Sequence, residues 1–354
     1  MPPKLPLEDL WKSRGAHFRE ESGWLVPASF GSPENEYRAA KETSAFFDLS
    51  WRGKLAVSGN DRISLLHNLL TNDILSLQNG GGCYAAFLTA QGKIIADMKV
   101  YIFEDHIFFD TEPGLPEKIA DRLGRFIITE DVLMKKASDV CHFLVTGPGA
   151  AHLLKEVFGN LPDFSFAHRG GQIAGRALTV VKSGLPGLDG YEIFVKEQDA
   201  RYVAEELLKT MPAAGHETWE SLRVEAGWLR YGQDMTEADT LPETGLDAIA
   251  ASETKGCYPG QEVVARTNTY KGHAKKMTAL SVDPGWKAEA GDKLKFEGEE
   301  AGWITSAAYA GRRCIMLGYL KKAYFDKGEA LRIVSGKDGA SASVSLHTIS
   351  LTPP

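Results

Sequence analysis

The chain has 354 residues, and its 40 Lys and Arg residues against 47 Asp and Glu residues give a formal net charge of -7. At about 150 residues per domain, this length predicts two to three domains. A hydrophobic fraction of 43% and a charged fraction of 25% are typical of soluble globular proteins and exclude wholesale disorder. The negative charge argues against general nucleic-acid binding.

Membrane insertion and export are not expected. No run approaches the roughly 18 apolar residues that a membrane helix needs, and the N-terminal MPPKLPLEDL lacks the apolar core of a signal peptide. The cysteines at 83, 141, 257 and 314 are far apart, which excludes a disulfide framework and a self-contained zinc site. We therefore expect a reducing compartment, the cytoplasm, or the mitochondrial matrix if the source is eukaryotic.

A weak internal repeat organises the first half of the chain. Residues 55–70 (LAVSGNDRISLLHNLL) and 143–158 (FLVTGPGAAHLLKEVF) each read as a strand, a turn with Gly, and an amphipathic helix. Gly59 and Gly147 suit a tight strand-to-helix turn because they lack a Cβ atom. The pattern predicts two related β-α units, although such segments are also common in unrelated mixed folds. Neither turn has the further residues of a nucleotide-binding loop.

The remaining elements follow the repeats in chain order. Turns at Gln91-Gly92 and Glu104-Asp105 indicate antiparallel hairpins in the first half. The elements expected before residue 278 are strands at 82–90, 93–103 and 106–112, a helix at 116–128, strands at 173–182 and 190–196, and helices at 198–210 and 216–229. Short strands that predict a small antiparallel barrel or sandwich follow at 278–282, 293–297, 300–310, 314–320, 330–334 and 343–349.

These elements predict an α+β fold with antiparallel strands rather than a regular β-α-β alternation. We expect an N-terminal α+β region at 1–140, a second α+β region at 141–275 and a C-terminal β-barrel at 276–354. The first two regions are expected to interleave, with residues 1–50 packing on the second.

Residues 253–276 (ETKGCYPGQEVVARTNTYKGHAKK) form the sharpest chemical feature of the sequence. Cys257 lies between Lys255 and a Tyr258-Pro259-Gly260 turn. A neighbouring ammonium favours the thiolate, so Cys257 is a candidate reactive thiol. A buried structural cysteine is the alternative, and both interpretations stay open at this point. The other three cysteines lie in or beside apolar strand patterns and are expected in the core.

The string Lys255-Gly256-Cys257-Tyr258-x-Gly260-Gln261-Glu262 resembles the signature of the YgfZ family of folate-binding, iron–sulfur-related proteins. The wider superfamily is that of the glycine-cleavage T-protein, the tetrahydrofolate-dependent aminomethyltransferase. Further segments that resemble its motifs, in the same order, are Phe47-Asp48-Leu49-Ser50, Thr71-Asn72-Asp73, Gly82 with Tyr84, Asp189-Gly190-Tyr191-Glu192-Ile193, Leu222-Arg223-x-Glu225-Ala226-Gly227 and Pro242-Glu243-x-Gly245-Leu246. The resemblance implies three domains, the last a small barrel, around a central hole that takes up tetrahydrofolate.

The resemblance also implies folate contacts for Glu192, Arg223 and Tyr84. Glu192 would accept hydrogen bonds from the amino and ring N–H groups of the pterin, because a carboxylate can accept two parallel donors. From the residues alone, Glu192 is an outward-facing polar residue of a strand. The corresponding alternative for Arg223 is a surface ion pair with Glu220 or Glu225.

Asp97 lies inside the apolar run Ile94–Val100, where a carboxylate costs several kcal/mol unless it is paired or protonated. In the aminomethyltransferases that this chain resembles, the matching acid stands near the folate nitrogens that take the one-carbon unit. There it does electrostatic or acid–base work. Ala96 stands where those enzymes tend to carry a second acid. This difference and the KGCY loop argue against plain glycine cleavage.

The sequence therefore leaves several hypotheses of function. The first is a YgfZ-type, tetrahydrofolate-binding protein that supports assembly or repair of iron–sulfur clusters in client or assembly proteins, with Cys257 as its thiol and Lys255 activating it. The alternative is a tetrahydrofolate-dependent aminomethyl- or methyltransferase that uses Asp97, Glu192 and Arg223. A third is a non-catalytic docking module. No residue set shows metal-ligand spacing, and whether the protein is an enzyme stays open.

Overall fold

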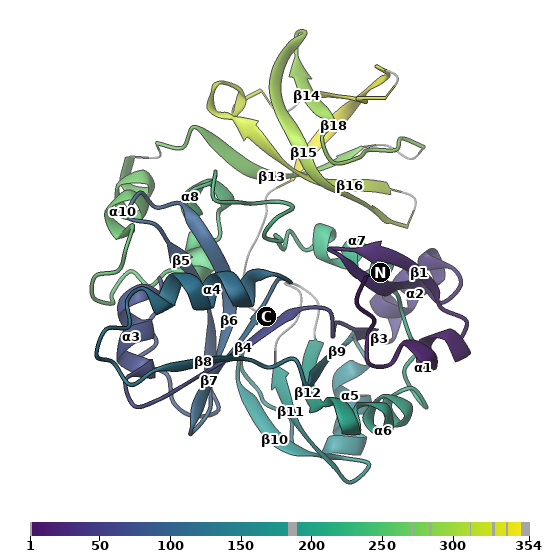
Figure 1. The fold of residues 1–354 in the computed structure, drawn as a ribbon. Coiled ribbons are helices and arrows are strands. Elements are labelled where there is room, and N and C mark those ends of the chain that lie inside the picture. The colour runs from purple at the N-terminus through teal and green to yellow at the C-terminus, as the bar shows by residue number, and fades with distance from the viewer. Residues whose placement is uncertain are drawn as a thin grey trace.

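The computed structural model describes residues 2–182, 190–270, 272–282, 285–311, 313–327, 330–337 and 339–347. Two five-stranded sheets and a closed six-stranded barrel form the framework of the fold. Figure 1 shows the barrel at the top, the sheet of β4 to β8 at the left and the sheet that contains β9 to β12 at the bottom. The α+β class with antiparallel sheets and a C-terminal barrel is confirmed.

The first sheet has the strand order β5-β6-β7-β4-β8, and every neighbouring pair is antiparallel. Its strands are β4 (Gly53–Ser58), β5 (Gly82–Leu88), β6 (Ile94–Ile102), β7 (His106–Thr111) and β8 (Leu133–Lys136). Apolar side chains from one face of the sheet pack against the helices α3 (Arg62–Leu69) and α4 (Leu115–Gly124) in a single core cluster.

The second sheet has the order β10-β11-β12-β9-β3. Its strands are β3 (Ala45–Asp48), β9 (Val140–Thr146), β10 (His168–Ile173), β11 (Arg176–Lys182) and β12 (Gly190–Lys196). One face packs against the helices α1 (Glu8–Ser13), α5 (Ala150–Phe158) and α6 (Glu197–Leu207). Strand β3 belongs to this second sheet although it precedes β4 of the first sheet in the chain. The N-terminal part of the chain therefore packs on the second sheet.

The remaining faces of the two sheets meet in a third core cluster. Tyr101 and Phe108 of the first sheet and Leu144 and Phe194 of the second belong to it. Each sheet is thus covered by helices on one face and by the other sheet on the opposite face. Polar residues on these inner faces are therefore removed from water.

The barrel has the strand order β13-β16-β15-β14-β17-β18. Its strands are β13 (Lys275–Val282), β14 (Lys293–Phe296), β15 (Glu299–Ala310), β16 (Arg313–Lys321), β17 (Arg332–Val334) and β18 (Ser341–His347), with the short helix η1 (Lys322–Tyr324) after β16. The other elements are β1 (His17–Glu21), β2 (Trp24–Ser29), α2 (Pro33–Glu42), α7 (His216–Glu225), α8 (Leu241–Thr244), α9 (Asp247–Ala250) and α10 (Gln261–Tyr270). Helix α7 contacts β2, β15 and β16, so it joins the N-terminal hairpin to the barrel.

Most of the predicted elements are present, but several bounds differ, and the sequence patterns did not predict α1, β1, β2, α2, β3, β8, β10, α8 or α9. The strand predicted at 173–182 is present as β11 but starts only at Arg176, because Ala174 and Gly175, with positive φ angles of 51° and 72°, form the turn that joins it to β10. The helix predicted at 216–229 ends earlier, with Gly227 at a φ of 73°. Helix α10 was not predicted. Asp189, and residues 348–349 of the last predicted strand, lie outside the described residues. The domain boundaries near 140 and 275 stay predictions.

Among the residues that the structure describes, no helix is both long and apolar enough to cross a membrane.

The internal repeat corresponds to β4–α3 in the first sheet and β9–α5 in the second. Both turns need glycine, because Gly59 and Gly147 have φ angles of 104° and 113°. A Cβ atom on Gly59 would lie 2.0 Å from the carbonyl oxygen of Asp131.

Gly59→Ala should therefore lower the free energy of unfolding by about 2–4 kcal/mol, since the backbone must move as well as adopt a strained φ. Gly114→Ala is the matched control, because Gly114 also has a positive φ, but a Cβ atom there would meet no other atom within 4 Å. It should cost about 1 kcal/mol. Urea denaturation measures both variants, and equal losses would show that the contact with Asp131 is unimportant.

Candidate functional site

Strand β6 supplies a row of polar residues to the interface between the sheets. Alternate residues of a strand point to the same face, so Asp97, Lys99 and Tyr101 share the face that meets the second sheet. All residues of β6 are buried. Buried polar groups are normally hydrogen-bonded, so the partners of these side chains describe the site.

Asp97 is paired on one side only. Its Oδ2 atom accepts a hydrogen bond of 2.7 Å from the hydroxyl of Tyr84, whereas Oδ1 is buried without a hydrogen-bond partner among the described residues. The ring of Tyr84 lies 4.9 Å from that of Trp228, centroid to centroid. Burial raises the pKa of Asp97 to about 6, and the nearby charge of Glu112 acts in the same direction. Asp97 is therefore a buried carboxyl group that can change its protonation near neutral pH.

Glu192 faces β6 from strand β12 and is buried, contrary to the outward orientation that alternation alone suggested. Lys99 donates to its Oε1 atom, and the hydroxyl of Tyr101 donates to Oε2 at 3.3 Å. Nε2 of His142 lies 3.3 Å from Oε2. Burial raises the pKa of Glu192, but Lys99 and His142 outweigh burial and hold this pKa well below its ordinary value. Glu192 is thus an ionised carboxylate whose oxygens already have protein partners.

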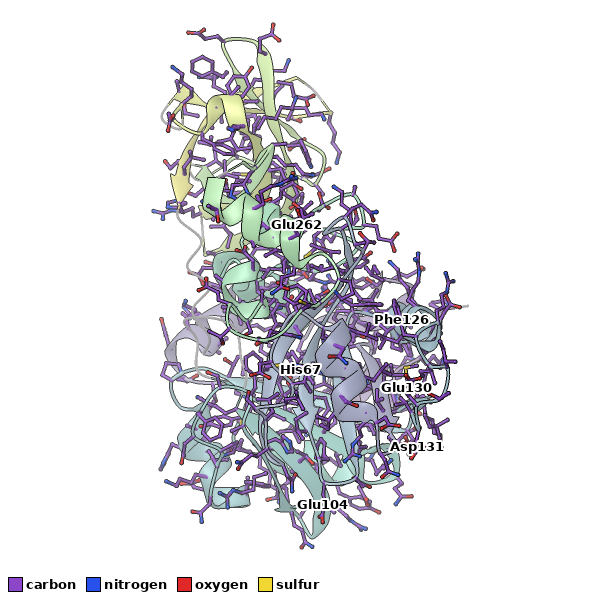
Figure 2. All side chains as sticks on the ribbon, turned by 90° about the vertical axis from the view of Figure 1, so that its left-hand side faces the viewer. His67, Glu104, Phe126, Glu130, Asp131 and Glu262 are labelled. Atoms are coloured by element: carbon purple, nitrogen blue, oxygen red, sulfur yellow. The ribbon has the colours of Figure 1, made fainter. Side chains whose placement is uncertain are left out.

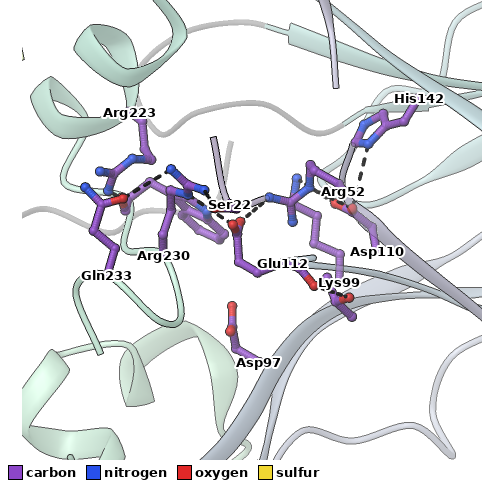
Figure 3. A network of polar contacts seen from close by, with 12 residues as sticks. Ser22, Arg52, Asp97, Lys99, Asp110, Glu112, His142, Arg223, Arg230 and Gln233 are labelled. Carbon is purple, nitrogen blue, oxygen red and sulfur yellow. Dashed lines mark hydrogen bonds and ion pairs between the residues drawn. The ribbon is translucent and has the colours of Figure 1, made fainter. Parts of the chain in front are cut away.

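A chain of buried ion pairs continues from this row toward the barrel. Glu112 accepts hydrogen bonds from Nη1 of Arg52 and from Nε of Arg230, the latter at 3.0 Å (Figure 3). Burial raises the pKa of Glu112, yet the two arginines lower it below its usual range. Arg230 also bonds Glu220 at 2.8 Å. Beside Arg230 and Glu220 lies a cavity of about 370 Å³, between the N-terminal hairpin, α7 and β15.

Arg223 stands at the barrel end of this chain. It is 0% exposed and donates to Glu220, Asp234, the carbonyl of Trp228 and the hydroxyl of Ser306. Burial lowers the pKa of Arg223, but Glu220 and Asp234 more than compensate and raise it. Its contact with Glu220 was anticipated, but in the core rather than on the surface. Its guanidinium group joins α7 to the barrel through protein acceptors.

The KGCYPGQE loop is anchored by Lys255 rather than by Cys257. Nζ of Lys255 donates to the backbone carbonyls of His67, Leu70 and Asn72, at the C-terminal end of α3, where a cation is favoured. Burial lowers the pKa of Lys255 to about 8. In Figure 2, His67 of α3 and Glu262 in the first turn of α10 lie on the face toward the viewer.

Cys257 is exposed, whereas Cys141 and Cys314 are buried and Cys83 is half-buried. Burial raises the pKa of the Cys83 and Cys141 thiols to about 12, and that of Cys314 above its ordinary value. The core placement is confirmed for Cys141 and Cys314. The activation of Cys257 by Lys255 stays a prediction, because the bonds described for the Lys255 ammonium go to backbone carbonyls.

Among the residues that the structure describes, Asp110, His142 and Glu192 form a group that could hold a metal ion, with ligand-type atoms all within 4.8 Å of one another. However, Lys99 and Arg52 already contact the two carboxylates. Their two positive charges would repel a metal cation. We therefore interpret the three residues as members of the buried ion pairs rather than as a metal site.

Sequence reasoning found Asp97, Glu192 and Tyr84, which the structure brings to one interface. It missed the cations around them. Lys99 could have been found, since it stands two residues from Asp97 in the same strand pattern. Arg52 and Arg230 gave no such signal, because each comes from a loop that reaches the site only in the folded chain.

The comparisons with known proteins agree with this architecture. A family model described as the GCVT N-terminal domain matches residues 7–254. The chain belongs to this family. Among curated relatives, an aminomethyltransferase of Bacillus licheniformis is 28% identical over 332 residues, which cover 90% of both chains. An aminomethyltransferase of Bacillus velezensis is 25% identical over 359 residues, 96% of each chain.

The fold of this GCVT-family chain is also that of a solved structure. The glycine cleavage system aminomethyltransferase T from Bartonella henselae superposes with a TM-score of 0.87 at 23% identity, over 99% of this chain and 98% of that one. The T-protein-like fold expected from the sequence is therefore confirmed. The two Bacillus relatives are named aminomethyltransferase and not after the YgfZ family, so they do not support the narrower YgfZ assignment.

The raised pKa of Asp97 predicts a pH-dependent loss of stability. An unfolded Asp has a pKa of about 3.9, so the folded protein binds this proton more tightly, and ionisation of Asp97 costs stability as the pH rises from about 4 through 6. Asp97→Asn removes this cost. Its free energy of unfolding should exceed that of the wild type at pH 8 by on the order of 3 kcal/mol and approach it at pH 4. Urea denaturation at both pH values measures this, and a pH-independent difference would contradict it.

Arg223→Met should lower the free energy of unfolding by about 3–5 kcal/mol, because Glu220 and Asp234 lose a buried partner. Arg125→Met is the control, since Arg125 and its partner Asp121 are both 63% exposed. It should change stability by less than about 0.5 kcal/mol. Thermal and urea denaturation compare the two. A loss in Arg223→Met as small as that of the control would remove the structural role.

Proposed function

We propose that this GCVT-family protein binds a reduced folate at the interface of its two sheets and transfers a one-carbon unit in the manner of the aminomethyltransferases. The observation that carries the proposal is Asp97, a buried carboxyl group with one unpartnered oxygen among the described residues and a pKa raised to about 6. General acid–base groups work best when their pKa lies near the working pH. The names of the relatives at 25–28% identity support the same reaction class.

The side chains around Asp97 fit a folate in chemical type. The rings of Tyr84 and Trp228 offer aromatic surface next to the carboxyl group, and Oδ1 of Asp97 can accept from a ligand N–H. Glu192 fits the donor edge of a pterin, although Lys99 now bonds it. The guanidinium N–H groups of Arg223 bond protein acceptors rather than facing a ligand. The proposed folate site therefore includes Asp97, Tyr84 and Glu192 but not Arg223.

A bound tetrahydrofolate would supply the nucleophilic nitrogen that bonds to the methylene carbon of an aminomethyl group on a thiol carrier. The bonds from this carbon to sulfur and to the amino nitrogen would break, and the thiol and ammonia would leave with the protons that the folate nitrogens lose. Asp97 in its ionised form accepts the proton that the attacking folate nitrogen loses, and its charge stabilises positive charge on the transferred carbon. Tyr84 fixes the orientation of the carboxyl group through its 2.7 Å hydrogen bond. The burial of Asp97 strengthens its electrostatic effect, because water is excluded.

A second candidate is the YgfZ-type function, folate-linked support of iron–sulfur cluster assembly in client proteins. One structural observation favours it: Cys257 is exposed while the other cysteines are at least half-buried. The loop that carries Cys257 is also fixed at the end of α3 by Lys255. One thiol cannot hold a cluster alone, since clusters take about four protein ligands, so a partner would share it. A cytoplasmic location remains part of either proposal.

Asp97→Asn should lower the rate of one-carbon transfer by at least about 100-fold, because the amide can neither accept the proton nor carry the charge. The assay mixes tetrahydrofolate with an aminomethyl donor on a dihydrolipoyl carrier and follows release of ammonia. Asn keeps an acceptor for Tyr84, and the stability measurements above verify that the variant is folded.

Cys257→Ser is the matched control and should keep the rate within about twofold, because Cys257 is exposed and outside the site. The reverse pattern, in which Cys257→Ser abolishes function and Asp97→Asn does not, would support the second candidate instead. Failure of tetrahydrofolate to raise the melting temperature would remove both. At 100 times the dissociation constant, a ligand adds about 2.7 kcal/mol of stability.

A further inference from the structure

The carboxylate of Glu192 is closed to a ligand in the described structure. It is 2% exposed, and both oxygens face protein groups: Lys99 on Oε1, and Tyr101 and His142 on Oε2. A ligand that presents an N–H pair to Glu192 must therefore take the place of at least one of these groups. Of these groups, Lys99 has a second carboxylate nearby to which it can move when it leaves Glu192.

That destination is Asp110, the direct cross-strand neighbour of Lys99 in the β6–β7 ladder. Oδ1 of Asp110 accepts from Nε of Arg52 at 2.8 Å. Oδ2 is buried without a hydrogen-bond partner among the described residues, and it lies 3.6 Å from Nζ of Lys99. A buried carboxylate oxygen without a donor is costly, so this position attracts an ammonium group.

The two positions are separated by a short step. A charged N–H···O bond is about 2.8 Å long, so an approach of less than about 1 Å lets Nζ of Lys99 bond Oδ2 of Asp110, and a further swing of the side chain in the same direction releases Oε1 of Glu192. A lysine stem has four methylene groups and permits such a shift without backbone movement. The ammonium remains close to both carboxylates throughout, so the buried charges stay balanced.

We propose that Lys99 is a movable cap on Glu192: it bonds Glu192 in the free protein and moves onto Oδ2 of Asp110 when a ligand with adjacent N–H donors occupies Glu192. The inference rests on the proposed folate function and deepens it. Lys99 and Asp110 act through Glu192, so they are positioning residues that select ligands. A ligand without such donors cannot replace the hydrogen bond that Glu192 loses when Lys99 moves away, so it binds weakly.

The test uses two substitutions and their combination. Asp110→Asn keeps an acceptor for Arg52 but presents an amide N–H₂ where Oδ2 was, so Lys99 has no second position. Lys99→Met removes the competitor for Glu192 at similar length. We expect Asp110→Asn to weaken binding of 5-formyltetrahydrofolate, a stable reduced folate, by about tenfold, the equivalent of one charged hydrogen bond. Lys99→Met should bind no more weakly than the wild type.

The decisive result is the double variant, Lys99→Met with Asp110→Asn. Its affinity should match that of Lys99→Met within about threefold, because Asp110 matters only through Lys99. If the two residues only stabilise the structure, both single variants should bind the folate more weakly than the wild type, and the double variant should bind it more weakly still. Isothermal titration calorimetry gives the dissociation constants, and circular dichroism verifies folding. If Asp110→Asn does not fold, Lys99→Met alone decides, since weaker binding by this folded variant would overturn the inference.

The outcomes separate this inference from the function on which it rests. If the wild type binds 5-formyltetrahydrofolate and the variants follow the pattern above, the movable cap is supported. If the wild type binds but Asp110→Asn binds equally well, or is not restored by Lys99→Met, the cap is wrong and the folate proposal stands. If the wild type shows no binding at millimolar ligand, both are wrong.

Discussion

The structure depends on the burial of Glu112 between Arg52 and Arg230. The two arginines lie 178 positions apart by subtraction of their residue numbers, and both bond one carboxylate inside the protein. Charges at such a site are tolerated only when they are paired and hydrogen-bonded. Because Arg230 also bonds Glu220 of α7, the same carboxylate connects the first sheet to the helix that carries the barrel. The relative position of the domains is therefore coupled to the polar groups at the site.

Sequence reasoning predicted the framework because its signals were local. Gly59 and Gly147 marked two strand-to-helix turns, and the turn residues after residue 278 marked a barrel. It also found Asp97, since an acid inside an apolar strand is conspicuous. The cations were different. The pairing of Arg52 and Arg230 depends on the meeting of distant loops, which no local pattern encodes.

The position of Glu192 was predicted differently by strand alternation and by the family resemblance, and the structure decides between them. The alternation of polar and apolar residues predicted that this side chain faces solvent, whereas the resemblance predicted that it contacts the folate. The structure shows that both faces of β12 are covered, one by helices and one by the first sheet, so alternation carries no information about exposure there. A fully buried strand with a charged residue requires a partner from elsewhere, and Lys99 is that partner.

The charges of this interface also explain why Asp97 differs from its neighbours. Lys99 is committed to Glu192, and Arg52 is shared by Asp110 and Glu112. The neighbouring cations lower the pKa of Glu192 and of Glu112, so both carboxyl groups are ionised. Asp97 has a tyrosine hydroxyl instead, and the negative charge of Glu112 nearby opposes its ionisation. The same network that fixes the fold thus leaves one carboxyl group able to exchange a proton, and a positively charged reacting centre beside it would shift Asp97 toward its ionised form.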